Sequence, residues 1–592
     1  MKVEGRRWKV LVACFVTSVG AQPSPSTSNL QPSTPKVLHI AQQSIGGDAI
    51  DPAQLNSLLV ANVIENVMEP MLRYDYLERP LKLVPNTLEA MPEVSEGGRV
   101  YTCRIKKGVF FAPDSAFKGK KRELIAADYA YGIRRLFDPR YKSSQLFLVD
   151  GKIPGADALR QAALAGKPFD YESPIPGLTV VDRYTLRITL NEPDLNFMHV
   201  LAQQNLAAVA REVVAAYGED IGLHPVGTGP FMLESQHAGS KLVFARNPNY
   251  REESFEGKKL PLLDRVELIY TVEDQPMWLA FLGRELDMMI NVPVSFRLQA
   301  APNGKLAPNL ARQGIQMHTW VYPAIWFDSF NMLDPVVGGY SPERVALRRA
   351  IALAFDRNQA INIIFNGGAL AANGLVPPGV AGHDADAITH VFDHDLSKAK
   401  ALLDMFGYVD RDGDGWRDAP DGSPLTISFA SPSQPRFRPW DELWSKAFKS
   451  IGIRMELTKM HQADLTKMLM AGKHQLAMNA WNMDYPDGED FFVLLYGPGS
   501  GTVNQSFFKL PEYDRLFDQA RLMSDSPERN RLYRQMDKLA FAYMPMVMTL
   551  YTVRLGLSYP WVHGYRPHPV HLEPWKYIDI DVAMRAKALA TR

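Results

Sequence analysis

The sequence has 592 residues, and its 65 Lys and Arg residues balance its 65 Asp and Glu residues, which gives a formal net charge of zero. Hydrophobic residues make up 46% of the chain and charged residues 22%. These values are typical of a globular protein and exclude a disordered chain or a polytopic membrane protein. A neutral chain has no overall basic field, so the composition also argues against a nucleic-acid-binding protein.

The first 21 residues are typical of a secretory signal peptide. Four basic residues stand among the first nine, residues 10–20 are uncharged and mostly apolar, and a small-x-small motif ends at Ala21. This pattern predicts export and cleavage before Gln22. Residues 22–35 are rich in Pro, Ser and Thr, which predicts a linker. The mature protein is therefore expected in the periplasm.

Cys14 allows a second interpretation of the same segment. The sequence Leu11-Val12-Ala13-Cys14 resembles a lipobox, which would make the protein lipid-anchored. However, only four residues separate Lys9 from Cys14, fewer than the 7–15 apolar residues usual in a signal peptide. We therefore favour the soluble periplasmic form. If residues 1–21 are removed, Cys103 is the single remaining cysteine, so no intrachain disulfide and no Cys-based zinc site can form.

Strands and helices alternate along the rest of the chain. Hydrophobic patterning predicts strands or strand-rich segments, with a hairpin at 177–190, over residues 37–40, 101–111, 177–190, 231–233, 241–246, 425–430 and 454–457. Helical spacing and helix-ending signals predict helices over residues 55–67, 127–136, 343–365, 396–406, 441–451 and 527–542. This alternation predicts a multi-domain α/β protein.

Common catalytic motifs are missing from the sequence. It has no G-x-S-x-G, no H-E-x-x-H and no Walker A motif. We therefore predict that the protein is not an enzyme. The alternative is an exported hydrolase with paired carboxylates in a cleft, which the many acidic residues leave open.

Ten segments, taken together and in this order, resemble the extracellular solute-binding proteins of family 5. This family includes dipeptide-, oligopeptide- and nickel-binding receptors of ABC importers. The matching segments are 101–109 (YTCRIKKGV), 124–130 (LIAADYA), 226–231 (VGTGPF), 246–250 (RNPNY), 347–351 (LRRAI), 355–357 (FDR), 397–403 (SKAKALL), 452–453 (GI), 481–487 (WNMDYPD) and 511–514 (PEYD).

The resemblance implies a two-lobed periplasmic-binding-protein fold of the α/β class with a hinge and an extra inserted domain. Domain I would comprise residues 36–78, 222–322 and 545–592. Domain II, the insertion, would be residues 79–221, and domain III residues 323–544. The family mechanism is capture of a solute between the lobes, hinge closure and delivery to a permease.

The same resemblance implies a function and partners. We expect a monomeric receptor without a cofactor, which binds short peptides and serves an ABC importer permease and ATPase complex at the inner membrane. A nickel chelate, an oligosaccharide or haem remains an alternative ligand, because one fold hosts many ligands.

The motif at 481–487 carries the predicted amine site. In peptide-binding relatives, an Asp at this spacing after the Trp pairs with the ligand's α-ammonium group, and the resemblance gives this role to Asp484. Trp481 would form an apolar wall with a cation-attracting face, and we include the neighbouring Tyr485. The alternative interpretation is a polar turn in which Asp caps the backbone.

Two arginines are candidates for the ligand's carboxylate. In dipeptide-binding relatives an Arg precedes the helix that corresponds to residues 441–451, where this chain has Arg436 and Arg438. Both can equally be solvated loop residues. Some oligopeptide-binding relatives carry a further Arg three residues before the Trp, but this chain has Met478 there, which puts that contact in doubt.

An aromatic cluster falls where the chain is expected to cross from domain I to domain III. Its members are Trp320, Tyr322, Trp326, Phe327 and Phe330. We expect most of them to pack in the core, and Tyr322 and Trp326 to face the ligand.

Two potential metal sites are discounted. Acidic residues at 410, 412, 414, 418 and 421 have the spacing of an EF-hand calcium loop, with Asp in place of the final Glu. The family commonly has an Asp/Gly-rich connection at this point. His563, His568 and His571 lie in a proline-broken segment without an acidic or Cys partner at metal spacing, and surface histidines are the favoured interpretation. We predict no metal.

Overall fold

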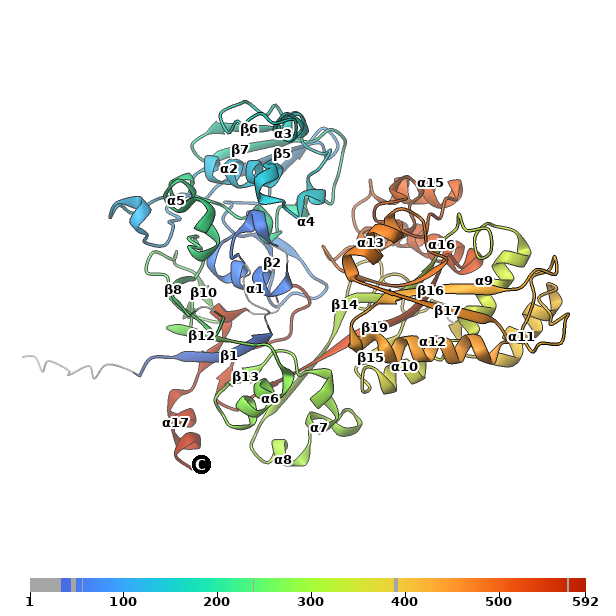
Figure 1. The fold of residues 1–592 in the computed structure, drawn as a ribbon. Helices are drawn as coiled ribbons and strands as arrows, with labels where there is room; N and C mark the ends of the chain where they lie inside the picture. Colours follow the sequence, from blue (N-terminus) through green and yellow to red (C-terminus); the bar gives the residue numbers. More distant parts are fainter. Residues whose placement is uncertain are drawn as a thin grey trace, which may run out of the picture. The chain divides into compact units, whose positions relative to one another are not determined.

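The structure is a computed structural model that describes residues 34–591, apart from 44–48, 56, 238, 388–391 and 572–573. Residues 36–592 form one compact unit, shown in Figure 1. The predicted signal peptide, Cys14 and all but the last two residues of the predicted linker lie outside the described residues. Among the helices that are described, none has the length and apolar character needed to cross a membrane.

The first sheet has four strands in the order β1-β12-β9-β8. Its strands are β1 (Val37–Gln43), β12 (Arg265–Thr271), β9 (Lys241–Arg246) and β8 (Phe231–His237). The predicted strands at 37–40, 231–233 and 241–246 all belong to it. It shares a hydrophobic core with helices α1 (Leu58–Val67) and α6 (Asp274–Leu282).

Gly227 and Gly229 bring the chain before β8 against α1. A Cβ atom at Gly227 would lie 2.2 Å from the carbonyl oxygen of Val67, and one at Gly229 would lie 2.7 Å from the carbonyl oxygen of Asn66. Asn247 holds the turn from the other side, since its side chain donates to the Gly229 carbonyl at 2.8 Å. The 226–231 motif is therefore a close backbone packing point.

The second sheet also has four strands, in the order β4-β5-β7-β6. They are β4 (Glu93–Ser95), β5 (Val100–Arg104), β7 (Thr185–Thr189) and β6 (Leu178–Asp182). Strands β6 and β7 pair antiparallel, which confirms the predicted hairpin at 177–190. The segment predicted to be strand-rich at 101–111 holds most of β5, which ends at Arg104, and isolated β-bridges at Ile105 and Phe110.

Four helices pack around this second sheet in a core of their own. They are α2 (Ala126–Phe137), α3 (Ala156–Leu164), α4 (Phe197–Val200) and α5 (Arg211–Tyr217). Arg135 of α2 ties this core to the segment after β1, because its guanidinium donates to both oxygens of Asp51 at 2.7 and 2.8 Å. Both side chains are almost fully buried.

The third sheet has seven strands and is the largest. Six follow the order β13-β19-β14-β18-β16-β17, and β15 pairs with β19. The strands are β13 (Met288–Met289), β14 (Gln316–Phe330), β15 (Ala369–Ala371), β16 (Thr426–Pro432), β17 (Arg454–Met460), β18 (Leu476–Asn482) and β19 (Met546–Ser558).

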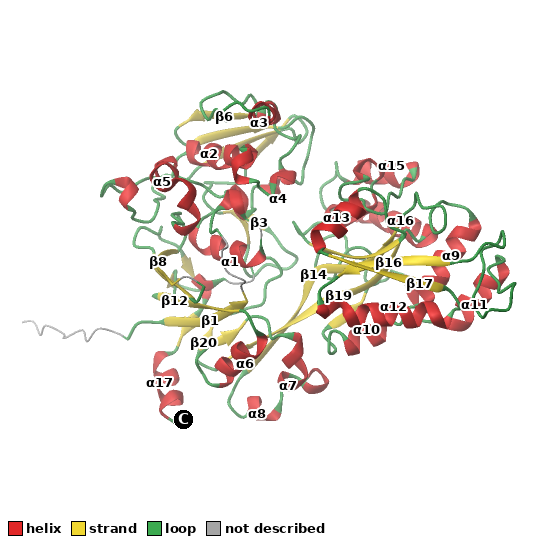
Figure 2. Cartoon of the chain, in the orientation of Figure 1, coloured by secondary structure: helices red, strands yellow, loops and turns green. Residues whose placement is uncertain are grey.

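Helices cover both faces of this sheet (Figure 2). Phe429 of β16 packs against Trp444 of α12 on one face, whereas Ala430 packs with Leu465 and Leu469 of α13 in a separate small cluster. The helices of this region are α9 (Pro342–Ala354), α10 (Arg357–Ile363), α11 (Leu396–Met405), α12 (Arg438–Ser450), α13 (Gln462–Met470), α14 (Glu489–Phe492), α15 (Pro511–Ala520) and α16 (Pro527–Tyr543).

The remaining elements are short. They are β2 (Leu72–Tyr74), β3 (Leu83–Pro85), β10 (Ser254–Phe255), β11 (Lys258–Lys259), β20 (Val562–His563), β21 (Asp579–Ile580), α7 (Arg297–Ala300), α8 (Pro308–Ala311) and α17 (Val582–Ala590).

One predicted helix was wrong in its extent. Residues 343–365 form two helices, α9 and α10, instead of one continuous helix. Asp356 begins the second, since its side chain accepts a hydrogen bond from the Gln359 backbone nitrogen at 3.0 Å. The apolar periodicity continues through the break, which is why the pattern alone did not reveal it.

Strands β14 and β19 lie side by side and pass between two hydrophobic cores (Figure 1). Tyr551 of β19 belongs to the core of the third sheet, whereas Leu555 belongs to the core of the first. Likewise, Ile325 of β14 packs in the third-sheet core and Met317 against the first. These two strands therefore connect the two cores.

Candidate ligand-binding site

A cleft of about 970 Å³ lies along the crossing strands β14 and β19. Tyr322 and Trp326, both predicted from the aromatic cluster, line it together with Arg436. The other lining residues come from the segment before α7, from Arg297 at its start, from Phe365 and Gly368, from β14, β18 and β19, and from positions 432, 437 and 462. The size is in the range of small-molecule sites. Three of the predicted ligand-binding residues line this one cleft.

The aromatic cluster divides between core and cleft. Phe327 and Phe330 are buried in the third-sheet core. Trp326 is half-buried, and its indole nitrogen donates to the Thr552 hydroxyl at 3.1 Å. Trp326 also packs against Phe437 and Trp440. The cleft wall is thus an extension of the core, which fixes its shape.

Tyr322 lies under a cation that the sequence patterns did not indicate. The guanidinium of Arg554 lies 3.7 Å from the centre of the Tyr322 ring, a cation–π distance. Burial raises the pKa of the Tyr322 hydroxyl; the charge of Arg554 opposes this rise and that of Asp484 adds to it. Tyr322 is therefore within electrostatic reach of both a cation and an anion.

Asp484 follows the end of β18, outside the residues that line the cleft. Its backbone nitrogen donates to Oδ2 of Asp490 at 2.8 Å, and the indole nitrogen of Trp481 donates to the same oxygen at 3.3 Å. Asp490, on α14, thus joins the two predicted residues. In the turn 484–487 it is the carboxylate of Asp487 that caps the backbone, at the nitrogen of Glu489.

Asp484 and Asp490 are both acidic groups whose pKa is raised. Burial raises the pKa of Asp484 to about 7. Burial, together with the charge of Asp484, also raises the pKa of Asp490 well above its ordinary value. No Lys, Arg or His of the described chain forms an ion pair with either group. This is a poorly solvated acidic site without a protein counter-ion.

Asp487 anchors the loop that carries Asp484. Arg529 of α16 donates to Asp487 from both terminal nitrogens, one of them at 2.9 Å, and Tyr533 donates its hydroxyl to the same carboxylate at 3.0 Å. The side chains of Arg529 and Asp487 are 2% and 4% exposed. This buried pair holds the loop in one place.

Tyr485 and Arg438 lie away from the cleft. The Tyr485 ring stacks on His199 of α4 with 5.6 Å between ring centres, and Tyr74 and His199 share a hydrogen bond at 2.8 Å. Arg438 is exposed, and its Nε donates to Glu442 at 2.8 Å. The structure therefore brings together Tyr322, Trp326 and Arg436 in the cleft, and joins Trp481 and Asp484 at Asp490. Tyr485 packs on His199 instead, and Arg438 lies in solvent.

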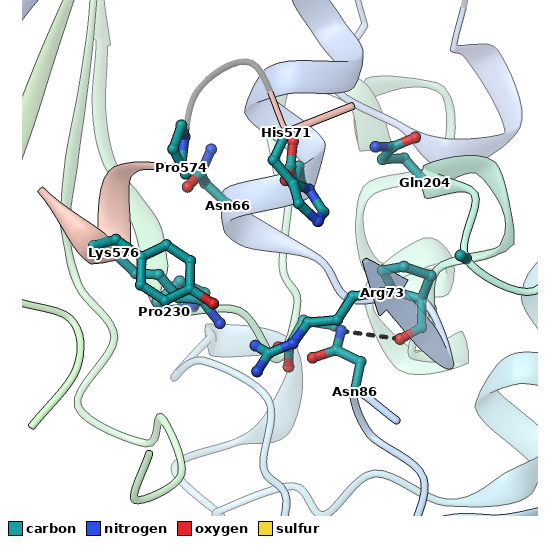
Figure 3. Close-up of a pocket in the computed structure, with 13 residues that line it drawn as sticks. Asn66, Arg73, Asn86, Gln204, Pro230, His571, Pro574 and Lys576 are labelled. Atoms are coloured by element: carbon teal, nitrogen blue, oxygen red, sulfur yellow. Dashed lines mark hydrogen bonds and ion pairs between the residues drawn. The ribbon is translucent and has the colours of Figure 1, made fainter. Parts of the chain in front are cut away.

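A second, smaller cavity lies between α1, the β2 region and the C-terminal segment. Figure 3 shows Arg73, Asn86, His571 and Lys576 around it. About 50 Å³ of it is open to the centres of water molecules, which is room for a few waters. Glu253 lies 2.7 Å from Arg73 and 3.0 Å from Lys576. This cavity belongs to a buried charge network, and it is too small for a peptide.

Neither metal candidate assembles the predicted ligand set. Asp410, Asp412 and Asp414 lie together, but Asp410 accepts from the backbone of Gly413 and Gly415, and Arg454 pairs with Asp414. The carboxylates at 418 and 421 bind Arg411 and Ser423 instead. His568 and His571 are not surface residues, contrary to the prediction: His568 is buried, and His571 pairs with Glu65 inside the structure.

Comparison with known proteins settles the class. A family model for bacterial extracellular solute-binding proteins, family 5, matches residues 82–502. The chain therefore belongs to this family, as its motifs indicated. The members are solute-binding receptors, not enzymes.

Three relatives illustrate the range of the family. Di/tripeptide-binding protein 2 of Pseudomonas aeruginosa is 24% identical over 97% of this chain and 99% of its own. Heme-binding protein A of Haemophilus influenzae is 23% identical over 83% of each chain. The periplasmic binding protein DppA of Helicobacter pylori, solved with the peptide STSA, superposes with a TM-score of 0.68 at 21% identity, over 92% of this chain and 98% of its own. The last comparison confirms the two-lobed, multi-domain fold class.

Proposed function

We propose that this protein is an exported receptor that captures short peptides and delivers them to an ABC importer, with Asp484 holding the ligand's α-ammonium group. The observation that supports this most directly is the carboxyl pair of Asp484 and Asp490, which has no cationic partner in the described chain. A ligand ammonium supplies the missing charge and the hydrogen bonds that a poorly solvated carboxylate requires. Trp481, whose indole nitrogen donates to Asp490, would supply an aromatic wall of this site.

The edge of β18 supports an extended ligand. β18 pairs with β16 only at Leu476 and Ala477, so residues 478–482 have no strand partner on that side in the described sheet. A peptide laid along this edge gains main-chain hydrogen bonds as an added strand. It would run from Asp484 toward Tyr322 and Trp326, with Arg436 as the predicted partner of its carboxylate.

The peptide-binding role also implies where the protein acts and how it delivers its ligand. The protein would act as a periplasmic monomer without a catalytic step, exported by residues 1–21, and would deliver ligand to a permease and ATPase complex. Lipid anchoring through Cys14 is the alternative form. The division at residues 78, 221, 322 and 544 remains our proposed domain organisation, with hinge motion about β14 and β19.

A thermal-shift experiment tests the ligand class. The mature protein is heated with a pool of short peptides and with the same pool N-acetylated. A ligand at 100 times its Kd adds about 2.7 kcal/mol of stability, so free amines should raise the Tm and acetylated peptides should not. Protein unfolded and refolded to remove carried ligand is the control. A shift with haem or an oligosaccharide but with neither pool would refute the peptide proposal.

Peptide affinity is expected to fall as the pH is lowered below about 7. The pKa of Asp484 is raised to about 7, so at lower pH the free protein must release a proton before it binds an ammonium group. Affinity should therefore rise with pH up to about 7, with a limiting slope of about tenfold per pH unit, and fall again above about 8, where the peptide's α-ammonium group loses its proton. Calorimetry in buffers of different ionisation enthalpy measures the released proton. Affinity that stays constant from pH 5 to 8 would contradict the expectation.

A further inference from the structure

The charges that line the cleft all have one sign. Its lining includes Arg297, Arg436 and Arg554, and no Asp or Glu is among its lining residues, all of which the structure describes. In the chain as a whole, acidic and basic residues are equal in number. A cleft with one sign of charge concentrates field and attracts ligand groups of the opposite sign.

Arg297 is held in place by main chain. It begins α7, and its Nη1 donates to the Val553 carbonyl oxygen at 3.1 Å. Gly368 leaves room for it, because a Cβ atom there would lie 2.8 Å from its Nε. Burial lowers its pKa. Within the described ranges it pairs with no carboxylate.

Arg554 is the residue that follows Val553 on β19. Its guanidinium lies over the Tyr322 ring, 3.7 Å from the ring centre, and burial lowers its pKa. The ring attracts the cation but does not neutralise it. Like Arg297, Arg554 has no carboxylate partner among the described residues.

A peptide's terminal carboxylate does not use all of these donors. It forms one bidentate contact with a single guanidinium, and Arg436, which is exposed above Phe437, is the predicted partner. Arg297 and Arg554 then stay half-buried without a counter-ion, which is unfavourable. A second anionic group on the ligand would satisfy them.

We propose that Arg554 and Arg297 form an anion subsite at the crossing of β14 and β19, and that the receptor selects short peptides with an acidic side chain. This inference rests on the proposed peptide function and specifies its substrate class. The Glu or Asp carboxylate of the peptide would contact Arg554 over Tyr322, while the amine stays at Asp484.

The test compares peptides that differ by one charge. Alanine tripeptides with a single Glu at the first, second or third position are titrated into the mature protein by calorimetry, each beside its Gln counterpart. At the best position Glu should bind at least tenfold tighter than Gln. Arg554→Gln should remove this preference, so that the Glu and Gln peptides bind the variant within about twofold of each other. Arg297→Gln provides a second variant in case Arg554→Gln unfolds.

Arg438→Gln is the matched control, because Arg438 is exposed and outside the cleft; it should keep the preference. If Glu and Gln peptides bind the wild type within twofold at every position, the anion subsite is refuted while the peptide function stands. Equal weakening of both peptides by Arg554→Gln would refute it as well. If no peptide binds, the peptide function fails and the inference falls with it.

Discussion

Asp484→Asn is expected to weaken the binding of free-amine peptides about 100-fold or more. Losing one partner of a desolvated charge pair costs about 2–5 kcal/mol, and about 2.8 kcal/mol corresponds to 100-fold. The same substitution should raise the Tm of the unliganded protein at pH 8. The pKa of Asp484 is raised to about 7, so its folded-state charge costs stability as the pH rises from about 4, and this cost is complete above 7.

Calorimetry and thermal unfolding at pH 5 and pH 8 measure both effects. Asp464→Asn serves as a control, because this exposed aspartate on α13 has a comparable change of charge outside the site. The Tm difference between Asp484→Asn and wild type should shrink at pH 5, where Asp484 is protonated. Unchanged peptide affinity in the variant would remove Asp484 from the site.

Short sequence patterns predicted many of the helices and strands, because the signals for these elements lie within a few residues of one another. The β6–β7 hairpin was visible in the alternation around Asp182 and Arg183, and α2 ends where Asp138 and Pro139 require it. The pairing of Asp51 with Arg135 spans 84 residues. No sequence period encodes such a contact, since it depends on how separate cores pack.

The candidate site likewise contains residues with a local sequence signal and residues whose position depends on long-range folding. Asp484 and Trp481 carry a motif that predicts a ligand site. Arg554 carries no such signal, because a lone Arg in a long apolar strand has no spacing pattern. The position of Arg554 was itself informative, because a charged residue in the middle of an apolar strand such as β19 requires either a charged partner or exposure in a cleft. Asp490 was missed because its role depends on the loop folding back to Trp481. Nothing in the sequence favours Arg436 over Arg438. In the structure Arg438 is the first residue of α12, whereas Arg436 lies in the segment before it.

Arg529→Met is expected to destabilise the protein by about 3–5 kcal/mol. The substitution leaves the Asp487 carboxylate buried without a cation, which is the costly way to break a buried ion pair. The loop from Asp484 to Asp490 also loses its anchor, so peptide affinity should fall by roughly tenfold even though Arg529 is not among the proposed ligand contacts. Denaturant unfolding and calorimetric titration measure the two losses.

Arg531→Met on the same helix is the matched control, because its pair with Glu528 is more than half exposed and such pairs contribute about 0–1 kcal/mol. Combining Arg529→Met with Asp487→Leu should cost less than Arg529→Met alone, since the charge of Asp487 is then not left buried without its cation. It should still lower peptide affinity, because the loop lacks the anchor between Arg529 and residue 487. If instead the double variant binds peptides as tightly as wild type, apolar packing is enough to hold the loop, and the buried pair does not position Asp484.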